Sequence, residues 1–207
     1  GAQFVSDDGS KAEGYVNSDA SVKAAEYLNE FIKNGYANLD PVKDEFLNGK
    51  AATLLGGSWN IADLEKSNLN WGVSYFPVAD DGKAVSPTGD WAAAITKDSK
   101  NPDAAGKFLQ WAMNSDNIAS YASAVAKPAS RTSSYDKMEG WDSGARALMK
   151  WQLQNTGVSR PRTPSYSVLS TDFSTAMLNI FSGSDAKEEL DNVAKNFDEN
   201  YEMYYKK

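Results

Sequence analysis

Residues 46–60 read Phe46-Leu47-Asn48-Gly49-Lys50-Ala51-Ala52-Thr53-Leu54-Leu55-Gly56-Gly57-Ser58-Trp59-Asn60, and this stretch sets the architecture of the chain. Just before it, Asp40-Pro41 supplies a capping carboxylate and a proline at the first helical position, which predicts a short helix that ends at Gly49. The apolar run 51–55 then ends at two glycines and predicts a buried strand. A second short helix is predicted over 60–66. Helix, strand and helix therefore follow one another closely here.

The alternation of helix and strand continues toward the C-terminus. Residues 71–76 alternate between apolar and polar side chains, and residues 91–96 follow a polar loop over 79–90, so both segments are predicted strands. Asn101-Pro102 repeats the cap-and-proline signal and predicts a helix that ends at about Met113. Short strands that alternate with helices predict an α/β fold, with helices packed on a sheet.

Helices dominate the rest of the chain. Apolar periodicity, capping residues and prolines mark their boundaries. The predicted segments are a helix over about 19–34, a largely helical region over 115–155 that is interrupted near Lys127-Pro128 and Gly140, an extended connector over 159–164, and helices over about 166–181 and 185–204. Aromatic residues on the predicted helices are expected in the core. They are Tyr27, Phe31, Phe46, Phe108 and Phe173.

Composition excludes several kinds of chemistry. The 207 residues include no histidine and no cysteine, which excludes disulfides, thiol catalysis, imidazole bases, and metal sites with imidazole or thiolate ligands. With 28 acidic and 21 basic residues the net charge is −7, and no nucleic-acid partner is expected. No apolar run reaches the ~18 residues of a membrane span. No phosphate-cradling or nucleophile-elbow motif occurs, so neither a cofactor nor a metal site is expected.

Catalysis would have to depend on carboxylates, serine, lysine or tyrosine. Adjacent acid pairs occur at Asp7-Asp8, Asp44-Glu45, Asp80-Asp81 and Glu188-Glu189. Neighbours in sequence do not face one another on a helix, so solvated surface positions are the simpler interpretation. A glycosidase needs two carboxyl groups about 5–10 Å apart in a cleft, and no pair with that geometry can be recognised here. No catalytic residue is assigned, and a carboxylate-dependent glycoside hydrolase stays open as an alternative.

Two tryptophans stand beside glycine-rich or polar loop residues. Ligands of open α/β sheets bind outside the carboxyl ends of strands, and Trp59 follows the end of a predicted strand. Trp91 stands instead at the start of its predicted strand, next to Asp90. An indole covers the apolar face of a sugar ring, while carboxylates and guanidinium groups bind its hydroxyls. Arg160 and Tyr166 flank the proline-rich connector and add a forked donor and a ring. The spacing equally allows both indoles to fill the core beneath the loops.

Taken in order, these motifs are similar to those of one protein family. The matching segments are Phe46 to Ala52 with Gly56 to Asn60, Trp71-Gly72-Val73 with Phe76-Pro77, Gly89-Asp90-Trp91 with Ile95, Lys97 to Ala105, Lys127 to Arg131, Arg160-Pro161 with Pro164 and Tyr166, and Ala176 to Gly183 with Leu190. Each segment is short, but the ordered set spans nearly the whole chain. It resembles the extracellular solute-binding proteins of ABC sugar importers, the maltose-binding-protein-like type 1 family.

The resemblance implies an α/β, periplasmic-binding-protein-like (type II) fold with two lobes. Family members run to about twice this length, which agrees with the absence of an initiator methionine and implies that most of the N-terminal lobe is missing from this chain. Residues 1–88 and 141–207 would form the C-terminal lobe, and residues 89–140 would be a partial N-terminal-lobe segment. Carried over by position, the implied ligand-binding residues are Trp59, Asp90, Trp91, Arg160 and Tyr166.

The function that the resemblance implies is capture of a carbohydrate, expected to be an oligosaccharide, and its delivery to an ABC importer by closure of two lobes. No enzyme activity is implied. The implied partners are the sugar and the ABC permease subunits, and contact with the membrane would come only through a lipid anchor upstream. The implied location is extracellular, and the protein would be either a cell-surface lipoprotein or periplasmic. A transporter-independent carbohydrate-sensing or adhesion module on the same fold is the second alternative.

The incomplete lobe has a further consequence. Without its lobe partners, the segment 89–140 would expose apolar surface around Phe108, Leu109 and Trp111. Exposed apolar patches promote association. We therefore expect the fragment to self-associate and to bind sugar weakly or not at all.

Overall fold

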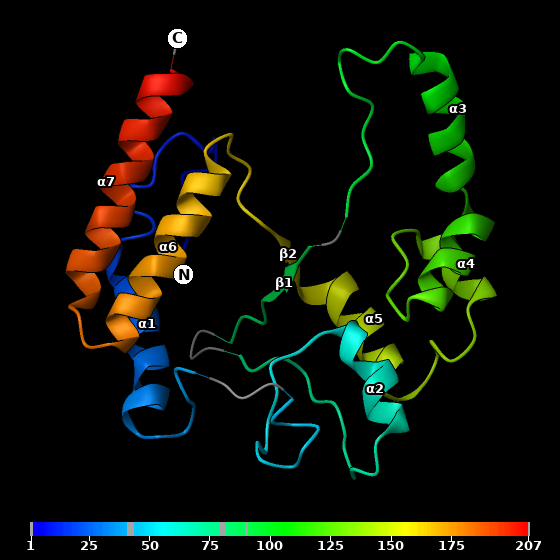
Figure 1. The fold of residues 1–207 in the computed structure, drawn as a ribbon, viewed down its shortest axis with the longest axis horizontal. Coiled ribbons are helices and arrows are strands. Elements are labelled where there is room, and N and C mark those ends of the chain that lie inside the picture. Colours follow the sequence, from blue (N-terminus) through cyan, green and yellow to red (C-terminus); the bar gives the residue numbers. More distant parts are fainter. Residues whose placement is uncertain (1, 41–43, 79–81, 90, 207) are drawn as a thin grey trace. The chain divides into compact units, whose positions relative to one another are not determined.

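The computed structural model describes residues 2–40, 44–78, 82–89 and 91–206, and the chain forms two compact units (Figure 1). Unit 1 consists of Gly1–Lys43 and Pro161–Lys207, and unit 2 of Asp44–Arg160. The helices of unit 1 are α1 (Asp19–Lys33), α6 (Tyr166–Phe181) and α7 (Ala186–Tyr204). Unit 2 contains the 3₁₀ helices η1 (Ser58–Asn60) and η2 (Thr132–Lys137), the helices α2 (Ile61–Lys66), α3 (Pro102–Ala112), α4 (Ser115–Ala124) and α5 (Gly144–Thr156), and the strands β1 (Ser86–Thr88) and β2 (Gly157–Ser159).

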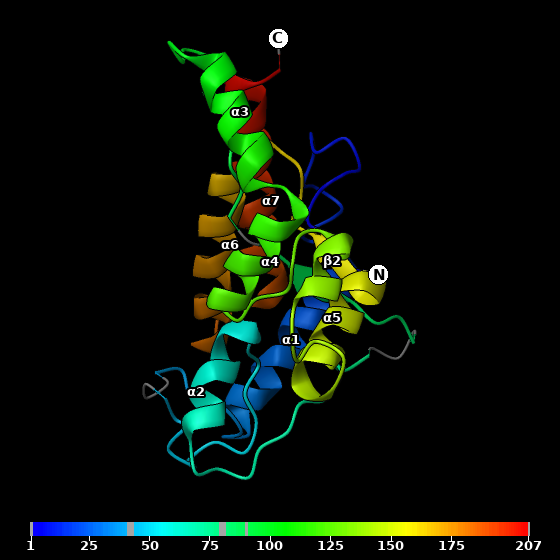
Figure 2. The ribbon, with the colours of Figure 1, turned by 90° about the vertical axis from the view of Figure 1, so that its right-hand side faces the viewer.

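The core of unit 1 lies between its three long helices. The helices α6 and α7 run side by side in both views, and α1 packs against both (Figures 1 and 2). Leu190 and Phe197 of α7 are fully buried, and Ile180 of α6 and Val16 of the N-terminal segment belong to the same apolar cluster. This continuous cluster gives unit 1 a closed hydrophobic core.

Side-chain oxygens hold the helix ends and the N-terminal segment of unit 1. Ser18 caps α1 and Asp185 caps α7, each by accepting a backbone N–H of the first turn. The carboxylate of Asp198 on α7 accepts the backbone N–H of Ala12 at 2.6 Å and that of Glu13 at 3.3 Å. One aspartate thus ties the beginning of the chain to its last helix.

Unit 2 combines short helices with a two-stranded parallel sheet. The strands β1 and β2 pair in the register Ser86↔Gly157, Pro87↔Val158 and Thr88↔Ser159. A separate apolar cluster is formed by Ile118, Ala119, Ala122, Ala129, Tyr135, Met138 and Trp141. The rings of Tyr135 and Trp141 meet edge to face, with their centroids 5.8 Å apart. The cluster joins α4 and η2 to the segment that precedes α5.

The three strands predicted from the sequence are wrong. The segments 51–55, 71–76 and 91–96 lie wholly within the described residues, and none of them forms a strand. The strands are instead β1, inside the predicted loop 79–90, and β2, which ends at the first residue of the predicted connector 159–164. A strand needs a neighbour for its N–H and C=O groups, and an apolar pattern does not reveal which segment supplies one.

The helix predictions are confirmed where capping and periodicity agree. The helices α1, α3, α6 and α7 lie in the predicted ranges, and the region 115–155 is interrupted as expected. The short helix predicted to end at Gly49 is not found: residues 41–43 lie outside the described residues, and 44–49 form turns. Asp44 has a φ of 61°, a left-handed backbone conformation that a right-handed helix cannot contain.

Three of the five helix aromatics expected in the core are exposed. Tyr27 is 65% exposed, Phe31 39% and Phe108 60%, so the expectation is wrong for these residues. Phe46 and Phe173 are half-buried, and Phe173 packs against the core of unit 1. Helical periodicity identifies an apolar face, but it does not show whether another element covers that face.

Units 1 and 2 are defined by the contacts within this chain. This division does not test the lobes that the resemblance implies, which are a C-terminal lobe of 1–88 and 141–207 and a partial N-terminal-lobe segment of 89–140. They stay a prediction.

We expect Phe197→Ala to lower the free energy of unfolding by about 3–5 kcal/mol, because a fully buried phenylalanine loses its transfer free energy and leaves a cavity. Urea unfolding followed by circular dichroism measures the change. The matched control is Tyr204→Ala on the same helix, where the side chain is 62% exposed and the change should stay within about 0.5 kcal/mol. Equal effects of the two substitutions would contradict the placement of this core.

Candidate functional site

The carboxyl edge of the parallel sheet brings two segments of unit 2 together. Because Thr88 pairs with Ser159, the next residues along the two strands, Gly89 and Arg160, are neighbours. A Cβ built on Gly89 would lie 3.2 Å from the Arg160 Nε, so the guanidinium group packs directly against the glycine backbone. The carboxyl edge is where open α/β sheets bind ligands. The geometry therefore places a forked cationic donor at this edge.

A groove of about 970 Å³ runs through unit 2 beside this edge. It is lined mainly by the segments 51–61, 69–77, 86–89 and 127–130 and by one face of α5. Most of the lining side chains are apolar or aromatic, with few polar groups among them, which is the character of small-molecule sites. All of the lining residues belong to unit 2.

Trp59 lies on this groove with its side chain 64% exposed. A Cβ built on Gly57 would lie 2.3 Å from the Trp59 ring, so the indole folds over a position that only glycine leaves open. The Asn60 Oδ1 accepts the N–H of Gly57 at 3.1 Å and fixes this turn. Trp91 is 89% exposed. The alternative that both indoles fill the core is therefore wrong.

The other sequence-predicted site residues differ in their placement. Asp90 lies outside the described residues. Trp91 and Arg160 belong to unit 2, and neither lines the groove itself. Tyr166 is the first residue of α6 in unit 1, where it is half-buried. Of the five residues, the structure brings Trp59 to the groove and Arg160 to Gly89 beside it.

Gln152 of α5 is a residue of this region that sequence reasoning missed. Its Oε1 accepts the backbone N–H of Phe76 at 3.1 Å, and its Nε2 donates to the Ser86 Oγ at 2.5 Å. The buried Thr156 hydroxyl lies 3.1 Å from the same Ser86 Oγ. One amide thus holds the groove segment 69–77 to β1. A glutamine on a helix carries no signal that separates this role from a surface position.

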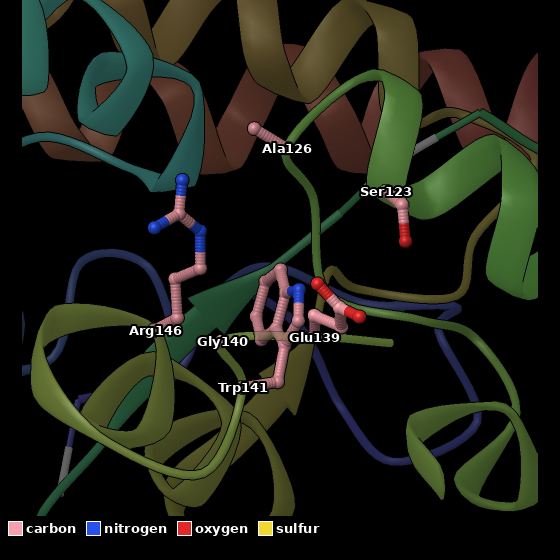
Figure 3. Close-up of a pocket in the computed structure, with 6 residues that line it drawn as sticks. All are labelled: Ser123, Ala126, Glu139, Gly140, Trp141 and Arg146. Carbon is pink, nitrogen blue, oxygen red and sulfur yellow. The ribbon is translucent and has the colours of Figure 1, made fainter. Parts of the chain in front are cut away.

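A smaller crevice of about 380 Å³ lies elsewhere in unit 2 (Figure 3). Its lining residues are Ser123, Ala126, Glu139, Gly140, Trp141 and Arg146. Arg146 extends toward α2, where its two terminal nitrogens donate to the two carboxylate oxygens of Glu65, the Nη2–Oε2 distance being 2.9 Å. This hydrogen-bonded pair lowers the pKa of Glu65 below its ordinary value. One lining residue of the crevice, Arg146, thus links α5 to α2.

Within the described ranges, no group of three or more His, Cys, Asp or Glu side chains could hold a metal ion. The helices in the described part of the chain are all too short or too polar to cross a bilayer.

The chain matches one family and resembles several characterised proteins. The profile of the family described as bacterial extracellular solute-binding protein matches residues 1–149. Two curated relatives from Bacillus subtilis strain 168, the maltodextrin-binding protein MdxE and the galactooligosaccharide-binding protein, are each 24% identical over 191 residues. Each match covers 87% of this chain and 45% of the relative, so the chain spans a little under half of the relatives' length.

The fold is shared with solved structures. The maltose-binding periplasmic protein MalE of Listeria monocytogenes, solved in complex with maltose, superimposes with a TM-score of 0.78 at 21% identity. The match covers 100% of this chain and 56% of the Listeria chain. The expected periplasmic-binding-protein-like fold is thereby confirmed.

The Glu65–Arg146 pair should make the stability of the fold depend on pH. Because the folded-state pKa of Glu65 is depressed, the pair stabilises the fold above the ordinary pKa of 4.5, and this stabilisation is lost as the pH falls through the lower folded value. Glu65 is 45% exposed, so solvent screens the pair and we expect Glu65→Gln to cost at most about 1 kcal/mol at pH 7.

Urea unfolding of the chain and of Glu65→Gln at pH 7, 5 and 3 measures this difference, which should shrink toward zero in the most acidic buffer. Glu139→Gln is the control, because this exposed carboxylate on the same crevice forms no ion pair among the described residues. A difference that persists unchanged at low pH would show that the ion pair does not hold α2 to α5.

Proposed function

The chain belongs to the bacterial extracellular solute-binding proteins, and from this premise we propose that it forms part of a receptor that captures a carbohydrate, expected to be an oligosaccharide. The observation that carries the proposal is the exposed indole of Trp59 on the groove of unit 2. Family membership assigns the protein to the extracellular or periplasmic space.

An oligosaccharide suits this groove because its rings have apolar faces and its edges carry hydroxyls. Trp59 offers the aromatic platform, and the guanidinium group of Arg160 offers hydrogen-bond donors at the adjacent sheet edge. Asp90 and Trp91, which directly follow Gly89 in sequence, complete the proposed ligand set of unit 2. Tyr166 of unit 1 stays a prediction from the resemblance. The two curated relatives are named for binding maltodextrin and galactooligosaccharide, which supports a sugar ligand.

Capture is proposed to proceed without chemistry on the sugar. The matched relatives are named as binding proteins. In the proposed cycle, two lobes close around the sugar, and the closed form delivers it to the permease subunits of an ABC importer. A lipid anchor carried by a longer form of the protein would hold the receptor at the cell surface.

Trp59 allows a direct test on this chain, even where binding is weak. The sequence contains six tryptophans, so six indole N–H signals are expected in a ¹H–¹⁵N spectrum, and Trp59→Phe identifies the one from Trp59. Millimolar maltotetraose or galactooligosaccharide should shift the Trp59 signal in a saturable way. The Trp111 signal should stay in place, because this indole is 61% exposed but lies outside the groove.

Trp59→Ala should weaken sugar binding by about tenfold or more, as expected when an aromatic anchor is removed. Because the variant lacks the Trp59 signal, its sugar binding is measured from the shifts of the remaining indole signals. Unchanged indole signals at saturating sugar would contradict the proposed site. Release of reducing sugar would instead favour the glycoside hydrolase alternative.

We also propose that the chain self-associates through α3. The exposed aromatic side chains of this helix support the proposal, since Phe108 is 60% and Trp111 61% exposed. Their ring centroids lie 5.9 Å apart, and no residue of α3, which is described over its whole length, is buried. Two such faces would cover one another in a dimer.

Sedimentation analysis at increasing concentration tests this association. The chain should shift from monomer to dimer at micromolar concentration, and the double variant Phe108→Ser/Trp111→Ser should remain a monomer. Tyr27→Ser is the control, because Tyr27 is an equally exposed aromatic residue on a helix of unit 1. A monomeric parent chain would contradict the proposal.

A further inference from the structure

The chain contains two Asn-Gly steps, Asn34-Gly35 and Asn48-Gly49. A glycine that follows asparagine leaves its backbone nitrogen open to the asparagine side chain, because no Cβ stands beside it. Asparagine is accordingly among the residues that limit the chemical stability of proteins at high temperature. Both asparagines are exposed, and the two glycines have similar left-handed backbones, with φ of 70° and 68°. The two steps are thus a matched pair whose surroundings can be compared.

Hydrogen bonds hold the side-chain amide of Asn34. Its Nδ2 donates to the backbone oxygen of Glu30 at 2.8 Å and to the carboxylate of the same residue at 3.4 Å. The following Gly35 N–H donates to the Ile32 oxygen at 3.0 Å. Asn34 is also the C-cap residue of α1, so its backbone continues the last turn of a helix. The amide is therefore directed back along α1 toward a negative charge.

Asn48 is less restrained. Within the described ranges its side chain forms no hydrogen bond. It lies in the turn 44–49, which begins at Asp44 with a left-handed φ of 61°, a conformation that is unfavourable for a residue other than glycine. The Gly49 N–H donates to the Phe46 oxygen at 3.0 Å, the same distance as in the first step. The two steps therefore differ in the asparagine side chain and in the element that holds it.

We propose that Asn48-Gly49 is a site of spontaneous covalent modification, at which Asn48 cyclises to a succinimide and is converted to aspartate and isoaspartate. The Gly49 nitrogen loses its proton to hydroxide and attacks the Asn48 Cγ. The new N–Cγ bond forms, the Cγ–Nδ2 bond breaks, and the amide nitrogen takes up a proton from water and leaves as ammonia. Water then opens either imide C–N bond, and nothing is oxidised or reduced.

The surroundings favour this reaction at Asn48 over Asn34 for two reasons. The attack builds negative charge on the asparagine side chain, which the Glu30 carboxylate beside Asn34 opposes. The attack also requires the glycine N–H to leave its acceptor and the asparagine side chain to turn toward the glycine nitrogen. A short strained turn opens more readily than a helix end, and at Asn48 no side-chain hydrogen bond has to break first.

The modification changes the wall of the groove, because Phe46 and Gly49 both line it. Either product carries a negative charge at neutral pH, where the amide has none. Isoaspartate also lengthens the backbone by one carbon. This disturbs the hydrogen bonds that close the turn, including the one that the Lys50 N–H donates to the Glu45 oxygen at 2.8 Å. The groove wall thus becomes heterogeneous as the protein ages.

Peptide mass spectrometry of the folded chain, incubated in mildly alkaline buffer, tests the proposal. Cleavage after lysine places Asn34 in the peptide 34–43 and Asn48 in the peptide 44–50, where it is the only amide side chain. Asn48 should gain the mass difference between an amide and an acid about tenfold faster than Asn34, which corresponds to roughly one hydrogen bond less to break. Fragment ions separate Asn34 from Asn38, and an isoaspartyl methyltransferase identifies the isoaspartate.

Three controls separate the effect of the structure from that of the dipeptide. In the urea-unfolded chain the two steps should react at similar rates, because their surroundings are lost. Glu30→Gln removes the carboxylate beside Asn34 and should speed conversion there severalfold, while Asn48 reacts as before. Asn48→Gln should leave the peptide 44–50 unconverted, because the longer side chain would have to close a less favourable six-membered ring.

Two results would overturn the proposal. One is conversion of Asn48 that is no faster than that of Asn34 in the folded chain. The other is the same ratio of the two rates in the folded and the unfolded chain, which would show that the turn has no part in the reaction. Both comparisons use the parent chain alone, so they stay decisive even where a variant fails to fold.

Discussion

Parallel pairing between β1 and β2 is the contact on which the functional part of unit 2 depends. It joins residues about 70 positions apart, and its register alone places Gly89 beside Arg160. A shift of one residue would move every side chain of these strands to the opposite face. Gln152 reinforces the pairing by holding a groove segment to Ser86. The site therefore derives its geometry from a few hydrogen bonds rather than from a large core.

The two units differ in how fully they bury their apolar side chains and pair their backbone groups. Unit 1 closes a continuous apolar cluster around Phe197 and anchors its N-terminal segment through Asp198. Unit 2 buries no residue of α3, and among the described residues the groove segments 52–56 and 70–75 form no backbone–backbone hydrogen bond. The chain spans a little under half of its curated relatives, so an open unit 2 is what part of a larger fold would present. Its exposed aromatic residues are accordingly candidates for contact with sugar or with protein.

Sequence reasoning predicted the helices well because their hydrogen bonds and caps are local, as at Ser18 and Asp185. It failed on the strands because pairing depends on distant segments, and the sheet formed in stretches that contain proline and polar residues. The place of Trp59 in a loop could be predicted, because the two glycines before it are typical of a turn. Gln152 could not, because its partners come from elsewhere in the chain. Familiar motif order recovered the fold where local patterns could not.

The hydrogen bond between Ala12 and Asp198 also bears on how the protein is made. These residues are 186 positions apart, so unit 1 cannot close this contact until α7 has left the ribosome. At about 5–20 residues per second, the N-terminal segment waits roughly 10–40 s for its partner. All of unit 2 emerges during that interval and can fold first. Unit 2 can thus fold during synthesis before the contact between Ala12 and Asp198 closes unit 1.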